Sequence, residues 1–379
     1  MICTCCNNEG VKVIIDLPAP SLTSINTIVP HNTTIYFCTF CCHLFKMEMD
    51  EIENFYSSEY KINLISESYD QIYELDEDNK PIYRNDYQAK IFLEMLASQN
   101  PKGGKVFDYG AGKGSTLKEI ILQNSDLVPY AYDYDKDYQK FWDFIPKNNQ
   151  MIGQIDKGCY GKMDYVVSFF VLEHVKDLHS YMENCYSLLK DKGLLFFVVP
   201  NSAVNIGDIL VVDHVHHFSK SSIEFLCQLH GFEIQSYSET AYNKGITILA
   251  QKKNKEHLTS YQNIKNTLYE PPVYLLELQS CLDKIKLIEL SLNSKFVVYG
   301  AGFYGSYFYT QFKRKELITA FIDSNKTMIN QKRFGLPIYH PNAFEDKSID
   351  VVLAVNPKQA QNVIQKVSFL KNRKVFTLE

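Results

Sequence analysis

The strongest constraint on the fold is a glycine-rich loop from Asp108 to Gly114, with the sequence Asp-Tyr-Gly-Ala-Gly-Lys-Gly. A short strand-like run at 105–107 precedes the loop, and a helix-like run at 115–123 follows it. Glycines at every second position allow the backbone to approach a ligand closely and to turn sharply into a helix. The loop therefore predicts a ligand site at the end of a strand in an open α/β sheet.

Two acidic residues indicate what kind of ligand this loop binds. Asp108 stands two residues ahead of the first glycine, and an acid at this place suits a ligand with an ammonium and a sulfonium group better than a pyrophosphate. Asp133 follows the next predicted strand, 127–132, where a carboxylate can accept hydrogen bonds from both hydroxyls of a ribose. Asp135 is a second candidate for that role. The alternative is a simple tight turn, with Asp133 serving only as a helix N-cap.

The central part of the chain alternates between strand-like and helix-like runs. The predicted helices span 86–98, 115–123 and 178–189, and the predicted strands span 105–107, 127–132, 164–169 and 194–199. Such alternation implies an α/β fold, with a parallel sheet and helices on both faces. The segment from Phe170 to His174 follows a strand, so we expect it at the carboxyl edge of the sheet, where ligands of open α/β folds bind.

The N-terminal segment 1–60 contains two C-x-x-C pairs, Cys3 with Cys6 and Cys38 with Cys41. The loop between the pairs is long enough to bring both onto one ion. Four thiolates form a closed tetrahedral zinc site, which would supply the folding energy that so small a segment lacks. The expected role is structural, and free thiols or a disulfide are the alternatives. Three further residues lie close enough in sequence to replace a proposed ligand: Cys5, Cys42 and His43.

The C-terminal part begins a second α/β pattern. An amphipathic helix is predicted over 273–292, after Pro271 and Pro272, with an apolar face at Leu275, Leu278, Leu282, Ile285, Leu287 and Leu290. A strand at 296–299 then leads into glycines at positions 300, 302 and 305, and later strands are predicted at 320–322 and 351–355. Asp323 stands where a ribose-binding acid is expected. Alone, this pattern suggests a dinucleotide site, although one G-x-G-x-x-G is a weak signal.

These patterns predict four segments along the 379 residues: a zinc-binding domain at 1–60, a central domain at 61–253, a helical linker at 254–293 and a Rossmann-like α/β domain at 294–379. More than one core is expected at this length. The net charge of −5, without a cluster of Lys and Arg, argues against a nucleic acid partner. We find neither a signal peptide at the start nor a run of about 18 apolar residues. A cytoplasmic protein without a membrane partner is expected.

Several of these motifs together resemble a known family. Asp108 to Gly114, Asp133, the run from Val171 to His174 and the run from Leu188 to Gly193 look like the successive motifs of class I S-adenosylmethionine-dependent methyltransferases. With the cysteine-containing segment 1–60, called the cysteine head below, and the glycine unit at 300–305, nearly the whole chain resembles the three-part nucleotide-sugar C-methyltransferases of deoxysugar biosynthesis. The resemblance implies S-adenosylmethionine as cofactor, bound by residues in and beside these motifs: Asp108, Gly110, Ala111, Gly112, Gly114, Asp133, Tyr134, Phe169 and Phe170.

The resemblance also implies a set of catalytic residues. In the family a base removes a proton beside a keto group, and the resulting enolate attacks the methyl carbon. His214 corresponds to that base, held by Asp213 or assisted by His174, and His217 is a second candidate. Imidazole suits this task because it titrates near neutral pH.

The same segment departs from the family pattern. Val211 stands where the family usually has a tyrosine, and the His-Gly-Gly-Ser stretch expected near Tyr242 to Gly245 is missing. The resemblance implies a nucleotide-linked or otherwise activated sugar as the acceptor, and these departures leave O-methylation open as an alternative. An NAD(H)-dependent oxidoreductase or a non-catalytic scaffold that uses the Gly300 to Gly305 site is the alternative from another class.

Overall fold

The computed structural model describes residues 1–49, 55, 72–75, 80–99, 103–253, 268–326, 328–344, 346 and 348–379. They form two compact units, each assembled from separated stretches of the chain. Unit 1 comprises Met1–Ile14, Ile35–Asn201 and Val215–Glu270, and unit 2 comprises Ile15–Thr34, Ser202–His214 and Pro271–Glu379. The cysteine-bearing parts of the head thus cluster with the central sheet. The four-segment division with limits at 60, 253 and 293 stays a prediction.

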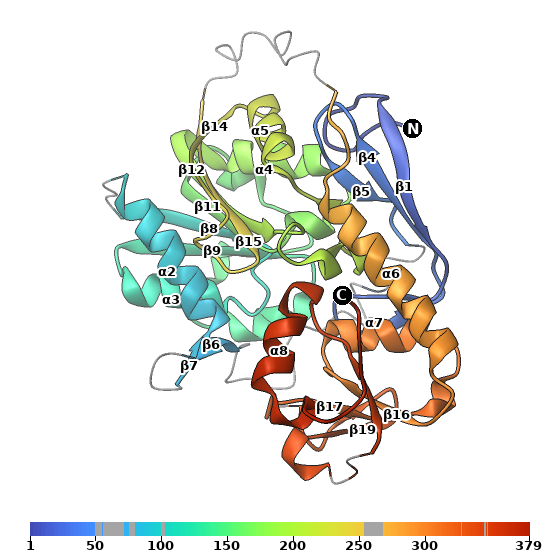
Figure 1. Cartoon of the computed structure of the whole chain (residues 1–379). Helices are drawn as coiled ribbons and strands as arrows, with labels where there is room; N and C mark the ends of the chain where they lie inside the picture. Colours follow the sequence, from blue (N-terminus) through green and yellow to red (C-terminus); the bar gives the residue numbers. More distant parts are fainter. Residues whose placement is uncertain are drawn as a thin grey trace. The chain divides into compact units, whose positions relative to one another are not determined.

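Unit 1 is built on a seven-stranded sheet with the order β10-β9-β8-β11-β12-β15-β14 (Figure 1). Its strands are β8 (Gly104–Tyr109), β9 (Leu127–Asp133), β10 (Gln150–Ile152), β11 (Met163–Phe169), β12 (Leu189–Pro200), β14 (Phe232–Ser238) and β15 (Gly245–Lys252). The first five are parallel, and β15 runs antiparallel to both β12 and β14. The predicted parallel α/β sheet is confirmed. Because β8 lies between β9 and β11, its carboxyl end is a point where the strand order reverses.

Helices cover both faces of this sheet, because apolar side chains of β12 are buried on each face. Leu194, Phe196 and Val198 pack with α2 (Arg84–Ala97) and α3 (Ser115–Gln123). Their neighbours Leu195, Phe197 and Val199 pack with α4 (Leu178–Leu188) and α5 (Lys220–Leu229). Successive strand residues point to opposite faces, so a strand buried on both sides must be apolar throughout. Full burial of each such side chain contributes about 1.5–3 kcal/mol.

The cysteine head contributes a smaller sheet with the order β1-β4-β5-β13. Its strands are β1 (Val11–Leu17), β4 (Thr33–Cys38), β5 (Leu44–Lys46) and β13 (His216–His217). Four cysteines of the head belong to the same buried cluster as the core residues of α4 and α5. Two short hairpins add further strands outside the large sheets: β2 (Ser21–Leu22) with β3 (Ile28–Val29), and β6 (Ile72–Leu75) with β7 (Pro81–Tyr83).

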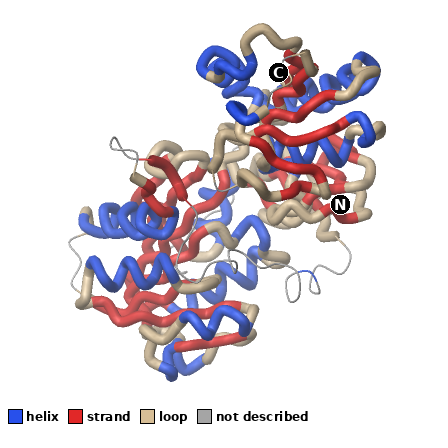
Figure 2. The backbone as a smooth tube through the Cα atoms, turned by 90° about the horizontal axis from the view of Figure 1, so that it is seen from below, coloured by secondary structure: helices blue, strands red, loops and turns tan. Residues whose placement is uncertain are grey.

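Unit 2 contains a six-stranded sheet with the order β18-β19-β17-β16-β20-β21, whose strands are drawn in red in Figure 2. The strands are β16 (Phe296–Tyr299), β17 (Ile318–Ile322), β18 (Lys332–Arg333), β19 (Leu336–Tyr339), β20 (Asp350–Leu353) and β21 (Val375–Thr377). Only β18 among them is antiparallel to its neighbour. The helices of this unit are α6 (Tyr274–Ser291), α7 (Phe303–Gln311) and α8 (Ala360–Lys366).

The helix predicted over 273–292 is observed as α6, with one correction to its buried face. Leu275, Leu278, Leu282 and Ile285 are buried, but Leu287 and Leu290 are 56% and 77% exposed. The apolar stripe continues at Ile288 instead, three residues after Ile285, because only positions at helical spacing share one face. Among the described residues, no helix has both the length and the apolar content needed to span a bilayer.

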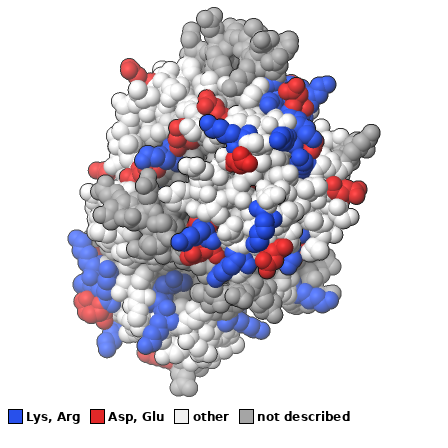
Figure 3. All heavy atoms as spheres, turned by 180° about the vertical axis from the view of Figure 1, so that it is seen from behind, with Lys and Arg blue, Asp and Glu red and all other residues white. Residues whose placement is uncertain are grey.

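Short 3-10 helices connect many of these elements. They are η2 (Lys136–Phe141), η3 (Lys147–Asn149), η4 (Lys157–Cys159), η5 (Leu172–His174), η6 (Ile206–Leu210), η9 (Lys315–Leu317), η10 (Pro341–Ala343), η11 (Pro357–Gln359) and η12 (Ser368–Leu370). Two of them, η5 and η6, contain or lead into residues that the sequence analysis singled out. On the surface, Figure 3 shows basic and acidic side chains interspersed over the face drawn.

Candidate functional site

The glycine loop after β8 has a left-handed backbone at all three glycines. The φ angles of Gly110, Gly112 and Gly114 are +81°, +50° and +72°. A Cβ atom on Gly110 would lie 2.5 Å from a methyl carbon of Val171, and one on Gly114 would lie 3.2 Å from Cδ1 of Trp142. A Cβ on Gly112 would meet nothing within 4 Å. A side chain at Gly110 would clash with Val171 and one at Gly114 would crowd Trp142, whereas Gly112 borders open space that a ligand can enter.

Two carboxyl groups belong to this loop region, the buried Asp108 and the partly exposed Asp133. Oδ2 of Asp133 accepts a hydrogen bond of 2.7 Å from the Gly112 N–H, so the acid at the end of β9 fixes the loop directly. Asp108 is 2% exposed, and burial, together with the nearby charge of Asp133, raises the pKa of Asp108 to about 8. Burial also raises the pKa of Asp133, although hydrogen bonds from backbone N–H groups oppose the shift. A cationic ligand would relieve the cost of charging this pair.

The alternative acid, Asp135, has a different local role. Its carboxylate accepts a hydrogen bond from the Asp137 N–H and caps η2, so part of its hydrogen-bonding capacity serves the helix. The sequence analysis did not single out Trp142, which supports the loop. The indole N–H of Trp142 donates to the Gly112 carbonyl oxygen at 2.7 Å, and its side chain is fully buried. No local pattern marks this residue, because its partner lies far away in the sequence.

The aromatic residues proposed for the cofactor lie at the ends of β9 and β11. Phe169 is the last residue of β11, and Phe170 follows with φ of +58°. A left-handed backbone costs a residue with a side chain about 1–2 kcal/mol, and such strain is concentrated at functional sites. The Arg84 guanidinium lies 4.3 Å from the centre of the Phe170 ring. Tyr134 is 59% exposed at the end of β9.

Two of the candidate catalytic histidines belong to unit 1. His174 ends η5 and is partly exposed, directly after Glu173, which is buried. His217 is buried in β13, where it is paired with Leu44 of the cysteine head. Its neighbour His216 contacts His43 across 3.1 Å, and burial lowers the pKa of His216 to about 3. This second group of histidines therefore belongs to a buried strand rather than to an open site.

His214 and Asp213 lie in unit 2, at the end of the segment that follows η6. Nδ1 of His214 is 2.6 Å from Oδ1 of Asp208. The sequence predicted that Asp213 holds His214, and it did not indicate Asp208. The Asp213 carboxylate instead accepts hydrogen bonds from the backbone N–H and the hydroxyl of Ser24, at 2.7 and 2.6 Å. No sequence signal indicates which of Asp208 and Asp213 contacts His214, because neither residue stands at a spacing from His214 that is characteristic of a catalytic pair.

The structure brings the four predicted zinc ligands together. The sulfur atoms of Cys3, Cys6, Cys38 and Cys41 all lie within 4.8 Å of one another. The Cys3–Cys41 and Cys6–Cys38 sulfur distances are 3.7 and 3.5 Å. Tetrahedral zinc with Zn–S bonds of about 2.3 Å requires sulfur separations of about 3.8 Å, so the cluster has the dimensions of a zinc site.

The residues that could have replaced a ligand lie outside this cluster. Sγ of Cys5 contacts the Ser222 carbonyl oxygen at 3.5 Å, and Nε2 of His43 faces His216. Cys42 has φ of +60° and is not among the clustered sulfurs. The clustered sulfurs are therefore those of the two C-x-x-C pairs from which the zinc site was predicted.

The glycine unit of unit 2 has an acid-capped glycine loop like the first one but a different backbone, because only Gly300 is left-handed and Gly302 has φ of −78°. Gly300 has φ of +105°, and a Cβ on Gly305 would overlap the Gly300 carbonyl oxygen, so both glycines are required by packing. Gly302 has nothing within 4 Å of a Cβ position. Oδ2 of Asp323 accepts a hydrogen bond of 2.7 Å from the Ala301 N–H, as Asp133 does from Gly112. Nucleotide binding at this loop stays a prediction.

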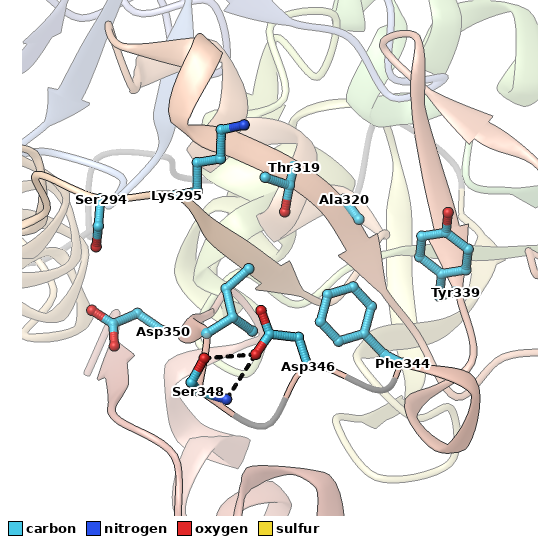
Figure 4. A pocket seen from close by; sticks show the side chains of 10 residues that line it. Ser294, Lys295, Thr319, Ala320, Tyr339, Phe344, Asp346, Ser348 and Asp350 are labelled. Atoms are coloured by element: carbon cyan, nitrogen blue, oxygen red, sulfur yellow. Dashed lines mark hydrogen bonds between the residues drawn. The ribbon is translucent and has the colours of Figure 1, made fainter.

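Unit 2 also contains an open pocket of about 580 Å³, shown in Figure 4. Its lining includes Lys295, Thr319 and Asp350, which lie at or near the starts of β16, β17 and β20. These three residues lie at the amino ends of the parallel strands, although the lining also includes Tyr339 at the carboxyl end of β19, whereas the Gly300 loop follows the carboxyl end of β16. Ligands of open α/β sheets bind at the carboxyl ends, so this pocket is not the counterpart of the glycine-loop site.

Comparison with known proteins finds similarity in the region around the first glycine loop. Residues 82–237 match the family described as methyltransferase domain. The juvenile hormone acid O-methyltransferase of Drosophila melanogaster is 26% identical over 172 residues, which cover 38% of this chain and 55% of that protein. The chain thus spans about half the length of this curated relative.

Solved structures of similar fold include two further methyltransferases. An S-adenosylmethionine-dependent methyltransferase from Clostridium acetobutylicum matches with a TM-score of 0.36 and 12% identity, over 44% of this chain and 92% of that one. The CurJ carbon methyltransferase matches with a TM-score of 0.35 and 14% identity, over 44% of this chain and 54% of that one. Likenesses this slight carry no argument about substrates.

Proposed function

We propose, from the premise that residues 82–237 form a class I S-adenosylmethionine-dependent methyltransferase domain, that this chain transfers a methyl group to a nucleotide-activated keto sugar. The observation that carries the proposal is the open position at Gly112, in a loop that begins with the buried Asp108 and is held by Asp133, within the residues that match the methyltransferase family. In this account Asp133 holds the ribose of the cofactor and Asp108 stabilises its positive charge.

The sugar acceptor is supported by the order of features along the chain. A four-cysteine head, the methyltransferase domain and a second glycine loop follow one another as in the nucleotide-sugar C-methyltransferases that the sequence resembles. We assign the glycine loop of unit 2, with Asp323, to the nucleotide part of the acceptor. Its open position at Gly302 resembles that at Gly112 and leaves room for backbone contact with a ligand.

His214 is proposed as the general base for carbon methylation. It would remove a proton from the carbon beside the keto group of the acceptor, which leaves an enolate at that carbon. S-Adenosylmethionine, when bound, supplies an electrophilic methyl group for this nucleophile. The bond to sulfur breaks as the carbon–carbon bond forms, and the proton remains on His214 until solvent accepts it. General base catalysis of this kind typically contributes about 10²–10⁴-fold to the rate.

O-methylation is the second candidate, and one finding favours it. The curated relative from Drosophila melanogaster is an O-methyltransferase, and its similarity covers 38% of this chain. An oxygen nucleophile on the acceptor would need only the removal of a hydroxyl proton, for which His214 is equally suited. His174 and His217 remain candidates for assistance, although the burial of His217 makes a structural role the simpler assignment.

A zinc ion is proposed at Cys3, Cys6, Cys38 and Cys41, with a structural role. The support is the separation of the sulfurs, which fits four thiolate ligands around one tetrahedral ion. Three of these cysteines are part of the same buried cluster as α5, so the ion would stabilise unit 1 as a whole.

Isotopic labelling tests the function and separates the two candidates. The full chain is incubated with methyl-labelled S-adenosylmethionine and a panel of nucleotide-linked keto sugars in deuterated water. Carbon methylation predicts label on carbon and uptake of deuterium beside the keto group, whereas label on oxygen supports the second candidate. Neither label transfer nor deuterium uptake with any sugar of the panel would contradict the sugar assignment.

Calorimetry tests the alternative from another class. Binding of S-adenosylhomocysteine that is lost in Gly112→Arg supports the methyltransferase. Binding of NAD(H) alone would favour an oxidoreductase that uses the Gly300 loop, and binding of neither would favour a scaffold.

A further inference from the structure

His214 is held on one side by a carboxylate that is itself firmly fixed. Nδ1 of His214 is 2.6 Å from Oδ1 of Asp208, and the side chains of these residues are only 14% and 4% exposed. The other oxygen of Asp208 accepts a hydrogen bond of 2.8 Å from the Ser202 hydroxyl. Because both carboxylate oxygens have protein partners, Asp208 has little freedom to rotate away from the imidazole.

This contact determines which nitrogen of His214 can take a proton. An ionised carboxylate accepts hydrogen bonds and cannot donate them, so Nδ1 of a neutral His214 must carry the hydrogen. The lone pair of the ring is then on Nε2, and Nε2 is the basic atom. After Nε2 takes a proton, the imidazolium is stabilised by the adjacent carboxylate. We infer that Asp208 is the positioning residue that sets the tautomer and the ring orientation of His214 for proton abstraction.

The turn that contains Asp208 is anchored by a tyrosine from the second glycine unit. The Tyr304 hydroxyl accepts a hydrogen bond of 2.9 Å from the Gly207 N–H and donates one of 3.0 Å to Oδ1 of Asn205. Burial raises the pKa of Tyr304, so its hydroxyl keeps the proton that it donates. A Cβ on Gly207 would lie 2.8 Å from Cζ of Tyr304, which excludes larger residues at that position.

Tyr304 thus gives the Gly300 to Gly305 segment a role besides any nucleotide contact. It lies in the first turn of α7, and its two hydrogen bonds fix the residues on either side of the start of η6. Asp208 is the third residue of η6, one position after Gly207. Removal of the Tyr304 hydroxyl therefore frees the turn that directs Asp208 toward His214, although Tyr304 comes from a distant part of the sequence.

The neighbouring tyrosine of α7 provides a matched control. Tyr307 is 3% exposed, and its hydroxyl has no hydrogen-bond partner among the residues that the structure describes. Tyr307→Phe removes the same atom as Tyr304→Phe from the same helix, without removing a hydrogen bond within the described part of the chain. A difference between the two variants therefore reports the bonds of Tyr304 to the turn.

The inference rests on the proposed function for its meaning, but its test does not require turnover. Nitrogen NMR of the full chain with ¹⁵N-labelled histidine reports the tautomer of each ring, and loss of one signal set in His214→Asn assigns His214. We expect His214 of the native protein to carry its hydrogen on Nδ1. Asp208→Asn is expected to lose this pattern, because its amide group can donate to Nδ1. Tyr304→Phe should produce a mixture of tautomers, and Tyr307→Phe should match the native spectrum.

Two results would overturn the inference: a native His214 with its hydrogen on Nε2, or the same His214 tautomer in Asp208→Asn as in the native protein. Calorimetric titration with S-adenosylhomocysteine accompanies each variant, and affinity within about twofold of the native value shows that the cofactor domain is folded. If an acceptor is found, Asp208→Asn should lower kcat by about 10²–10⁴-fold with little change in KM. A native Nδ1 tautomer without any methyl transfer would contradict the proposed function and support the positioning role.

Discussion

The substitution Gly112→Ala tests whether this glycine is needed for folding or for contact with the ligand. Gly112 has φ of +50°, and a Cβ at this position meets no atom within 4 Å. The added methyl group therefore causes no clash in the ligand-free protein. Its only cost to folding is the left-handed backbone of a residue with a side chain, about 1–2 kcal/mol. For a unit of this size, each kcal/mol lowers Tm by about 2–4 °C.

Gly161→Ala is the matched control for this cost. Gly161 has φ of +68°, also with nothing within 4 Å of a Cβ position. It precedes the start of β11, so it lies at the end of the sheet opposite the glycine loop. Both variants should therefore lose a similar free energy of unfolding. Only Gly112→Ala places a methyl group where the cofactor is expected to contact the backbone.

Calorimetric titration with S-adenosylhomocysteine and thermal unfolding together give the comparison. We expect Tm to fall by a few degrees in both variants, and the affinity to fall by at least about tenfold in Gly112→Ala alone, which corresponds to about 1.4 kcal/mol. Equal affinity in Gly112→Ala and the native protein would refute the reasoning that the open position is the ligand contact. An equal loss of affinity in Gly161→Ala would show that the effect is one of stability.

The remaining predictions concern Asp108, the cysteine cluster and His214. Burial raises the pKa of Asp108 to about 8, so its carboxyl group is mostly protonated at pH 7. Binding of a cationic cofactor should therefore release a proton from Asp108, which calorimetric titrations in buffers of different ionisation enthalpy detect. The affinity for the cofactor should rise as the pH approaches 8. The raised pKa of Asp108 also makes the free energy of unfolding depend on pH. The contribution of Asp108 is fully present below about pH 4, its pKa in the unfolded chain, and is lost as the pH rises toward 8, which urea unfolding across that range measures. Chelation should remove one zinc ion per chain, as elemental analysis measures, and should lower Tm. Cys38→Ser should also lose the zinc ion, whereas Cys5→Ser should keep it because Cys5 lies outside the cluster. His214→Asn should lower methyl transfer by about 10²–10⁴-fold, measured with labelled cofactor, while the affinity for S-adenosylhomocysteine stays unchanged.

The strand, glycine loop and helix around Gly112 could be predicted from the sequence because their determinants are local. The strand before Asp108, the glycines and the helix from Ser115 follow one another directly along the chain, and each has its own backbone preference. The acid at the end of β9 was predictable as well, since parallel strands bring their carboxyl ends to one edge of the sheet. The clustering of the four cysteines was predictable from the ligand chemistry of one ion.

The partner of His214 could not be predicted in this way. Asp208 reaches the imidazole only because η6 turns the chain, and η6 is fixed by Tyr304 from a distant part of the sequence. His217 illustrates the same limit, because the pairing of β13 with β5 joins a strand of the cysteine head to one that follows most of the central sheet in sequence. Contacts of this kind depend on tertiary packing, which neither periodicity nor residue spacing encodes.

The central claim is that the domain around Gly112 binds S-adenosylmethionine. It is tested most directly by calorimetric titration of the full chain with S-adenosylhomocysteine and, in parallel, with NAD(H). The account predicts saturable binding of S-adenosylhomocysteine at one site per chain, with an affinity that Gly112→Ala weakens. Absence of this binding in a folded protein would contradict the claim.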